Sequence, residues 1–362
     1  RLFAKVTFAG NALKEGIAAV LKLAAPYTGT VNITITQDEF LIESRAELNI
    51  AFVKIPVESI ELQEETVRFG IMIEQLRLAV GNKKDKITVA LENVVLKIAA
   101  KNYRSELTTI DYIEYPKVAK QDSETLVITK EQSEWLKSTA NSVALKPNLI
   151  SPIMPVTVHA DDSGITVACY ARDHIVFTQS NKITGKIDFS IPIESFASIF
   201  SVFGKDEFKL MASESYVHAK NELYEVYISL PATDAYLPVD VLLTRLTAFK
   251  ESSGSDVVIN YKELTEFFSN IKAVMMTERP EVGITTSKGK AIFSCKTSLG
   301  NVQFACVNEA NDDIDIKLDA EYLKEAVAKT DKKDVKIKCC QNDGFVLIPL
   351  KDESCSVIAL NS

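Results

Sequence analysis

The sequence has few of the residues from which catalytic and metal sites are usually built, with three histidines, six cysteines and one tryptophan in 362 residues. Its cysteines form no Cys-x-x-Cys pair, which argues against a zinc site, and a disulfide framework is not expected in a long, unsecreted chain. No metalloprotease, serine-hydrolase, Walker or dinucleotide-binding motif is present. We therefore predict reduced, mostly buried thiols and a protein that is not an enzyme, with no catalytic residue, metal or cofactor.

Long apolar runs are also missing from the sequence. No uncharged apolar stretch reaches the roughly 18 residues that a membrane span needs, and Arg1–Lys5 shows no signal-peptide pattern. Hydrophobic residues make up 46% and charged residues 25% of the chain, which excludes a largely disordered protein. We expect a cytoplasmic protein of two or three domains, with a net charge of −8.

The most informative feature is a threefold internal repeat. A lysine-aspartate turn followed by an alternating strand occurs at Lys84, Lys205 and Lys333. Two more strand-like stretches follow each turn, at 94–100 and 106–110, at 216–219 and 224–230, and at 345–350 and 355–360. A short helix is predicted just before each turn, around Glu74, Glu194 and Glu321, which are 120 and 127 residues apart.

A second predicted helix opens each repeat after a β-type run, at 12–25, 130–145 and 261–276. Thr129 and Gln132 form a plausible capping box at the start of the middle one. The last one carries an apolar stripe at helical spacing, made of Leu264, Phe267, Phe268, Ile271, Val274 and Met275.

These patterns predict an α+β fold of three tandem similar domains, each with two helices packed on strand-rich antiparallel sheets. The expected domains are 1–118, 124–243 and 255–362, separated by polar stretches at 116–123 and 250–255. Leu237–Leu243 is an apolar stretch just before the second linker. The alternative is three unrelated α+β domains whose spacings coincide.

Three segments carry a resemblance to a known family: Val167–Val176, Pro231–Pro238 and Val357–Leu360. They resemble segments of the bacterial-type β sliding clamp, the DNA polymerase processivity factor. Val167–Val176 resembles the family's strand and turn Val-Ala-Thr-Asp-Gly-His-Arg-Leu-Ala-Val. Pro231–Pro238 loosely resembles Phe-Pro-Asp-Tyr-x-x-x-Leu-Pro, and Val357–Leu360 resembles the terminal Val-Met-Pro-Met. The threefold architecture extends this resemblance over the whole chain.

The sequence also departs from the family at these motifs. Arg172 stands in place of the turn glycine, His174 in place of the arginine and Ala359 in place of the tail proline. Ala25–Thr30 replaces a longer basic loop after the first helix. These differences indicate a diverged member of cellular or viral origin; if viral, its location is the host cytoplasm.

The resemblance implies the DNA clamp fold and a ring that encircles duplex DNA without reading its sequence. Such a clamp tethers the replicative DNA polymerase, the clamp loader and other partners through short hydrophobic peptides. Packed helices lie roughly 9 Å apart, so six would leave no room for a duplex, whereas twelve leave a hole of about 24 Å. We therefore expect a head-to-tail homodimer, with domain 1 of one copy against domain 3 of the other.

The six predicted helices with their C-terminal flanks carry 15 basic and 11 acidic residues, whereas the rest of the chain is acidic. This separation favours helices that line the hole and weakly attract phosphates. Charged helices are also ordinary solvated surfaces, so the enrichment is modest. The predicted DNA-facing residues are Lys14, Lys22, Arg77, Lys83, Lys84, Lys137, Lys146, Lys272, Lys329, Lys332 and Lys333.

The resemblance further implies a partner-peptide pocket between domains 2 and 3, completed by the C-terminal strand. Its predicted residues are Ile153, Tyr170, Arg172, His174, Ile175, Pro238, Leu242, Ile358 and Leu360. The alternative interpretation is that the apolar members are ordinary strand core.

Two other functions remain open from the sequence. Overall acidity fits a three-domain structural or adaptor protein that does not encircle DNA. An enzyme would require a strongly perturbed titrating group in a deep pocket.

Overall fold

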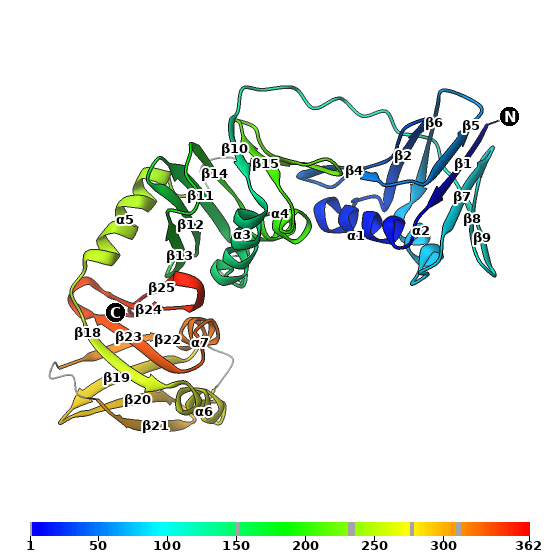
Figure 1. Ribbon diagram of the computed structural model, residues 1–362. Coiled ribbons are helices and arrows are strands. Elements are labelled where there is room, and N and C mark those ends of the chain that lie inside the picture. The colour runs from blue at the N-terminus through cyan, green and yellow to red at the C-terminus, as the bar shows by residue number, and fades with distance from the viewer. Residues whose placement is uncertain (1, 150–151, 231–235, 276–278, 309–312) are drawn as a thin grey trace. The chain divides into compact units, whose positions relative to one another are not determined.

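The computed structural model describes residues 2–149, 152–230, 236–275, 279–308 and 313–362 (Figure 1). These residues form two compact units, one within 1–137 and 194–231, the other within 138–193 and 232–362. Part of the Pro231–Pro238 motif, residues 231–235, lies outside the described residues. No helix in the described ranges is long and apolar enough to cross a membrane.

The same order of elements occurs three times along the chain. The first repeat contains β1 (Phe3–Phe8), α1 (Ala12–Ala24), β2 (Thr30–Thr36), β3 (Phe40–Arg45), β4 (Asn49–Ile55), β5 (Ser59–Leu62), β6 (Thr66–Met72), α2 (Ile73–Val80), β7 (Ile87–Glu92), β8 (Val95–Ala100) and β9 (Tyr103–Thr108). The second contains β10 (Glu124–Ile128), α3 (Lys130–Val143), β11 (Pro155–Asp161), β12 (Gly164–Tyr170), β13 (His174–Ser180), β14 (Ile187–Pro192), α4 (Ile193–Phe203), β15 (Phe208–Ala212), β16 (Tyr216–Lys220) and β17 (Tyr224–Ser229).

The third repeat contains β18 (Ser255–Asn260), α6 (Tyr261–Ile271), β19 (Glu281–Ser287), β20 (Lys290–Thr297), β21 (Gly300–Val307), β22 (Asp315–Asp319), α7 (Ala320–Ala328), β23 (Asp334–Cys340), β24 (Phe345–Pro349) and β25 (Ser354–Ala359). Each repeat is therefore a strand, a helix, several strands, a second helix and three strands, with β5 added in the first. The six predicted helices all form. The predicted domain boundaries stay predictions.

The strands make four antiparallel sheets, two in each unit. The first unit has the orders β5-β1-β7-β8-β9 and β10-β15-β16-β17-β4-β3-β2-β6. The second has β14-β11-β12-β13-β25-β24-β23-β18 and β21-β20-β19-β22. In both eight-stranded sheets, the last strand of one repeat pairs with a strand of the preceding repeat, β17 with β4 and β25 with β13.

The linker at 111–123 has no regular structure but is fastened to the sheet beside it. The side-chain amide of Asn32 donates to the carbonyl of Ile113 at 2.8 Å and its oxygen accepts from the Ile113 N–H at 3.1 Å. The guanidinium of Arg45 lies 4.5 Å from the centre of the Tyr115 ring. The polar composition thus marks a connection between repeats whose path is fixed by these contacts.

Helix α5 (Val239–Glu251) is the element that sequence reasoning missed. The segment Leu237–Leu243, expected as an apolar stretch before a linker, leads into a helix that ends at Glu251, within the polar stretch at 250–255. Pro238 is the N-cap residue, and Asp240 lies in the first turn, where a carboxylate interacts favourably with the helix dipole. The short stretch before the polar residues shows too little helical periodicity to reveal this.

The cores follow the predicted stripes. Helix α6 buries Leu264, Phe267, Phe268 and Ile271 against the strands of the third repeat. Val274 is buried and Met275 packs at the edge of the same core, as the stripe predicted. Four of the six cysteines are buried and the other two are half-buried, which confirms the expectation that most thiols are buried.

The predicted capping box at the start of α3 is present. The Thr129 hydroxyl accepts from the Gln132 N–H at 3.2 Å, and the Gln132 side-chain oxygen accepts from the Thr129 N–H at 3.0 Å. We expect Thr129→Ala to lower the free energy of unfolding by about 1 kcal/mol in urea denaturation. Thr129→Ser keeps the acceptor and is the matched control. An equal loss in both variants would contradict a contribution from the cap.

Candidate functional site

The structure divides the predicted pocket residues between two faces of the sheet that contains β13 and β25. Tyr170, Ile175 and Leu242 lie in one apolar cluster, where α5 covers the sheet. Ile358 belongs to the core of the third repeat, and Leu360 packs against that core. Successive residues of a strand point to opposite faces, so Val357 joins the first cluster and Ile358 the second.

The remaining predicted pocket residues do not join either cluster. Ile153, Arg172 and Pro238 are exposed, and Ile153 has 60% of its surface accessible. His174 is buried and forms a hydrogen bond through Nε2 to the Ser356 hydroxyl at 2.6 Å. No single cluster therefore holds all nine.

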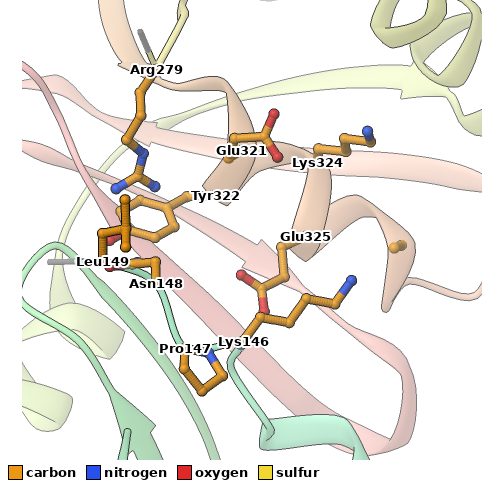
Figure 2. A pocket seen from close by; sticks show the side chains of 10 residues that line it. Lys146, Pro147, Asn148, Leu149, Arg279, Glu321, Tyr322, Lys324 and Glu325 are labelled. Atoms are coloured by element: carbon orange, nitrogen blue, oxygen red, sulfur yellow. The ribbon is translucent and has the colours of Figure 1, made fainter. Parts of the chain in front are cut away.

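A cavity of about 590 Å³ lies in the second unit (Figure 2). One wall is the segment after α3, another is the exposed side of α7, and Arg279 closes a third side. Most of its lining surface is apolar, and five of its lining residues are charged. Its lining residues are Lys146, Pro147, Asn148, Leu149, Arg279, Glu321, Tyr322, Lys324, Glu325 and Ala328.

The segment after α3 is hydrogen-bonded to α7. The Lys146 N–H donates to Glu325 Oε1 at 2.8 Å, and the ammonium of Lys329 donates to the carbonyl of Ala144. Burial lowers the pKa of Lys329, although the neighbouring Glu325 carboxylate opposes that shift. These contacts hold two sides of the cavity in a fixed geometry.

The third side of the cavity is built around Asp319 and Tyr322. Asp319 caps α7 by accepting the Tyr322 N–H at 3.0 Å, and its other oxygen lies 2.9 Å from the Arg279 Nε. The Arg279 guanidinium lies 4.4 Å from the centre of the Tyr322 ring, a cation–π contact that Figure 2 shows from the side. Asp319 thus holds the backbone of Tyr322, and Arg279 contacts its ring.

His174 lies next to Tyr322, with the centres of the two rings 5.0 Å apart. Burial, and secondarily the charge of Lys329, lower the pKa of His174 to about 3. The imidazole is therefore neutral at physiological pH. Its Nδ1 is buried without a hydrogen-bond partner in the described residues.

A mainly apolar lining with charged residues in it suits a short peptide, whose apolar side chains contact the lining while its polar groups meet the charged residues. No cluster of three or more histidine, cysteine, aspartate or glutamate residues able to hold a metal occurs in the described ranges. Sequence reasoning missed Arg279 and Glu325, because neither belongs to a motif and the two are brought together by folding.

The predicted DNA-facing residues of the first unit differ in their exposure and in whether their charged groups are already bonded within the protein. The Lys14 ammonium donates to the Asn82 side chain at 2.8 Å, and Arg77 pairs with Glu74. Lys83 donates to the carbonyls of Ala79 and Val80 at the end of α2. The residues that are exposed are Lys14, Lys22, Arg77 and Lys84, whereas Lys83 and Lys137 are half-buried.

In the second unit, the predicted DNA-facing residues Lys146, Lys272, Lys332 and Lys333 are exposed. Lys329 is half-buried and its ammonium is engaged by Ala144. A lysine at a helix C-terminus can satisfy the helix's own carbonyls or those of a neighbour. Lys83 and Lys329 do so here.

The buried histidine predicts an acid sensitivity. Between pH 7 and 5 the unfolded chain protonates His174 and the folded chain does not, so this group lowers the free energy of unfolding by about 2 kcal/mol. In urea denaturation at pH 5, 6 and 7, His174→Gln should flatten the pH dependence. A variant with the wild-type dependence would show that the folded protein protonates His174.

His159 provides a control of opposite sign. Burial lowers its pKa, but the hydrogen bonds and charges of Asp188 and Asp161 raise it overall. Its stabilising contribution is therefore present at acidic pH and is lost as pH rises through the raised pKa. His159→Gln should make the loss of stability on acidification steeper, the reverse of His174→Gln.

No protein-family model and no curated protein matches the sequence. Among solved structures, the DNA polymerase III β subunit of Thermotoga maritima matches with a TM-score of 0.82, 14% identity and 99% of both chains covered. The β subunit of Pseudomonas aeruginosa matches with a TM-score of 0.78, 12% identity and 99% of both chains. The Helicobacter pylori β clamp bound to a DNA ligase peptide matches with a TM-score of 0.71, 13% identity and 99% of both chains. The chain therefore has the fold of bacterial β sliding clamps over almost its whole length, at a highly diverged sequence.

Proposed function

We propose that this protein is a DNA sliding clamp, a non-enzymatic processivity factor that encircles duplex DNA as a cytoplasmic homodimer. It tethers the replicative DNA polymerase and other partners during DNA replication. The observation that carries the proposal is the match to clamp structures over 99% of the chain. The H. pylori clamp structure contains a bound peptide, which supports peptide docking as the means of recruitment.

Ring closure is supported by two edge strands. Neither has the strand partner that the equivalent strands of the other repeats have. The last strand of the second repeat pairs with β4, and the last strand of the third pairs with β13. The last strand of the first repeat, β9, ends its sheet, and so does β21, the counterpart of β4 and β13. Pairing β9 of one copy with β21 of another would complete both sheets.

The chemistry of both edges suits this pairing. Strand β21 runs for eight residues without a charge, which is rare for an edge that stays in water. Val307, the last residue of β21, is 77% exposed, and Leu299, just before the strand, is 61% exposed. On the other edge, Tyr103 at the start of β9 is 41% exposed, and Leu78 on the adjacent α2 is 64% exposed. Association would bury these apolar side chains.

The register follows from the ladders that the repeats share. Tyr103 of β9 is structurally equivalent to Tyr224 of β17 and to Ser354 of β25. In each repeat, this position is reached by following the paired residues across the sheet from the first strand of the repeat.

Phe304 of β21 is likewise structurally equivalent to Val53 and Thr178. In each repeat, this position is reached by following the paired residues across the sheet from the residue four positions before the second helix. The observed partners are Tyr224 with Val53 and Ser354 with Thr178. Tyr103 therefore pairs with Phe304 of the second copy. Along the same antiparallel ladder, Glu106 pairs with Asn301.

Non-specific attraction for DNA is supported by the exposed lysines on and after the helices. Phosphate contacts of this kind give affinity without sequence preference. Lys83 and Lys329 contribute less than predicted from sequence, because their ammonium groups are already bonded inside the protein. The peptide-binding function falls to the cavity around Tyr322 and to the apolar face that contains Tyr170.

A disulfide across the junction tests the ring. Glu106 and Asn301 are both exposed, and we expect the variant with Glu106→Cys and Asn301→Cys to form covalent dimers on oxidation. When it is oxidised in the presence of nicked circular plasmid, the protein should stay on the plasmid in SDS. Linearising the plasmid or adding reductant should release it.

The matched control carries Glu106→Cys with Val302→Cys, which places the second thiol on the other face of β21. Efficient cross-linking of the control would disprove the register. Cross-linked dimers that remain equally on circular and linear DNA would disprove encirclement and favour an adaptor protein.

Charge reversal tests the DNA surface separately. Lys22→Glu with Lys84→Glu should weaken duplex binding and reduce the slope of log affinity against log salt by about 0.9 for each phosphate that the protein no longer neutralises. Lys209→Glu, on exposed sheet surface, is the control and should leave the slope unchanged. Equal effects of both changes would mean that only net charge matters.

A further inference from the structure

Helix α5 stands outside the threefold order of elements. Between β9 and β10 the chain is an extended linker, whereas between β17 and β18 it forms a helix of 13 residues (Figure 1). An element present at one junction and missing at the equivalent one is not required by the fold of the repeat. It therefore calls for a separate explanation.

Helix α5 covers an apolar face that spans the junction between the second and third repeats. Beneath it lie Tyr170, Ile175 and Phe177 from β12 and β13, and Phe345 and Val357 from β24 and β25. The helix contacts this face through Leu242 and Leu246, which are 1% and 0% exposed. These leucines lie one turn apart on one side of the helix.

The attachment of α5 is narrow. Only Leu242 and Leu246 are buried among its 13 residues, whereas α1, of the same length, buries seven. At its end, Phe249 meets Phe345 edge-on with ring centres 4.9 Å apart. The exposed Lys250 ammonium donates to Gln179 at 2.7 Å. Elements with few buried side chains and exposed hydrogen bonds open at the lowest free energy.

The segment after α5 crosses directly over the sheet. A Cβ at Gly254 would lie 2.7 Å from the Cys339 carbonyl oxygen and 2.8 Å from the Cys340 sulfur. Only glycine permits this approach. Cys340, which is 1% exposed, thus lies under the chain that leads out of α5 and belongs to the covered cluster. The reactivity of the Cys340 thiol therefore indicates whether α5 and the segment after it are docked on the sheet.

We propose that α5 is a tethered competitor for this apolar face, and that it leaves when a partner helix with large apolar side chains at positions i and i+4 takes its place. The inference rests on the proposed clamp function, because the covered face contains the predicted pocket residues Tyr170 and Ile175. A partner must displace α5, so its apparent affinity is proportional to the fraction of molecules in which α5 is undocked.

The experiment compares the wild-type protein with Leu242→Ala plus Leu246→Ala, and with Val241→Ala on the exposed side of α5 as the matched control. The rate of maleimide labelling is measured at Cys340, with Cys295 in the third-repeat core as an internal reference. We expect labelling of Cys340 to rise at least tenfold in the double variant and to stay unchanged in the control. Labelling of Cys295 should stay slow in all three.

The second measurement uses a fluorescent peptide with the sequence of residues 237–251. It should bind the double variant at least tenfold more tightly than the wild type, because only the variant leaves the face open. Unchanged Cys340 labelling and no preference of the peptide for the variant would overturn the proposal.

If Cys295 is labelled as fast as Cys340, the double variant has lost its fold, and Phe249→Ala decides instead. This change loosens the end of α5 without touching the two leucines. Faster labelling of Cys340 alone supports the proposal, and unchanged labelling overturns it. The plasmid retention test does not depend on α5. If the protein forms a ring but α5 stays docked, only this inference is disproved. If α5 is displaced but no ring forms, only the clamp function is disproved.

Discussion

The architecture depends on one interaction, the antiparallel pairing of the last strand of a repeat with a strand of the repeat before it. β17 completes the sheet of β4 and β25 completes that of β13, so neither repeat closes its sheets alone. Among the strands that occupy the equivalent positions in the three repeats, β9 and β21 are the two without such a partner in the described residues. Because these bonds are made by the backbone, they require strand geometry and register and no particular side chain.

This dependence explains how the fold persists at 12–14% identity to known clamps. Backbone ladders tolerate wide changes of sequence as long as the buried face stays apolar, as it does at Val226, Ala51 and Val176. Surfaces that recognise partners depend on particular side chains and have no such tolerance. Tyr170 and Ile175 of the resembling motif lie under α5, whereas Arg172 is exposed and His174 is buried beside Tyr322, so the residues of one motif meet different surroundings in this chain.

The features of this fold that could be predicted from the sequence are those encoded locally. The stripe of α6, the Thr129–Gln132 cap and the order of helices and strands were visible because periodicity and capping act over a few residues. The division of the pocket was not visible. Tyr170 and Ile358 match one motif set, yet the alternation of β25 places Val357 and Ile358 on opposite faces, and a family motif does not state which side a helix such as α5 will cover.

The lysines show a different limit of sequence reasoning. A cation near a helix C-terminus stabilises the helix and also suits a phosphate, so the same pattern predicts both uses. Lys83 and Lys329 bond to carbonyls of the protein, whereas Lys22 and Lys84 are exposed, and nothing local in the sequence separates the two pairs. Position in the folded chain decides between them: Lys329 is half-buried where Ala144 approaches α7, and its lowered pKa is a consequence of that burial. A cation already bonded and desolvated has little left to offer DNA, so the charge available for a duplex is smaller than the composition of the helices implies.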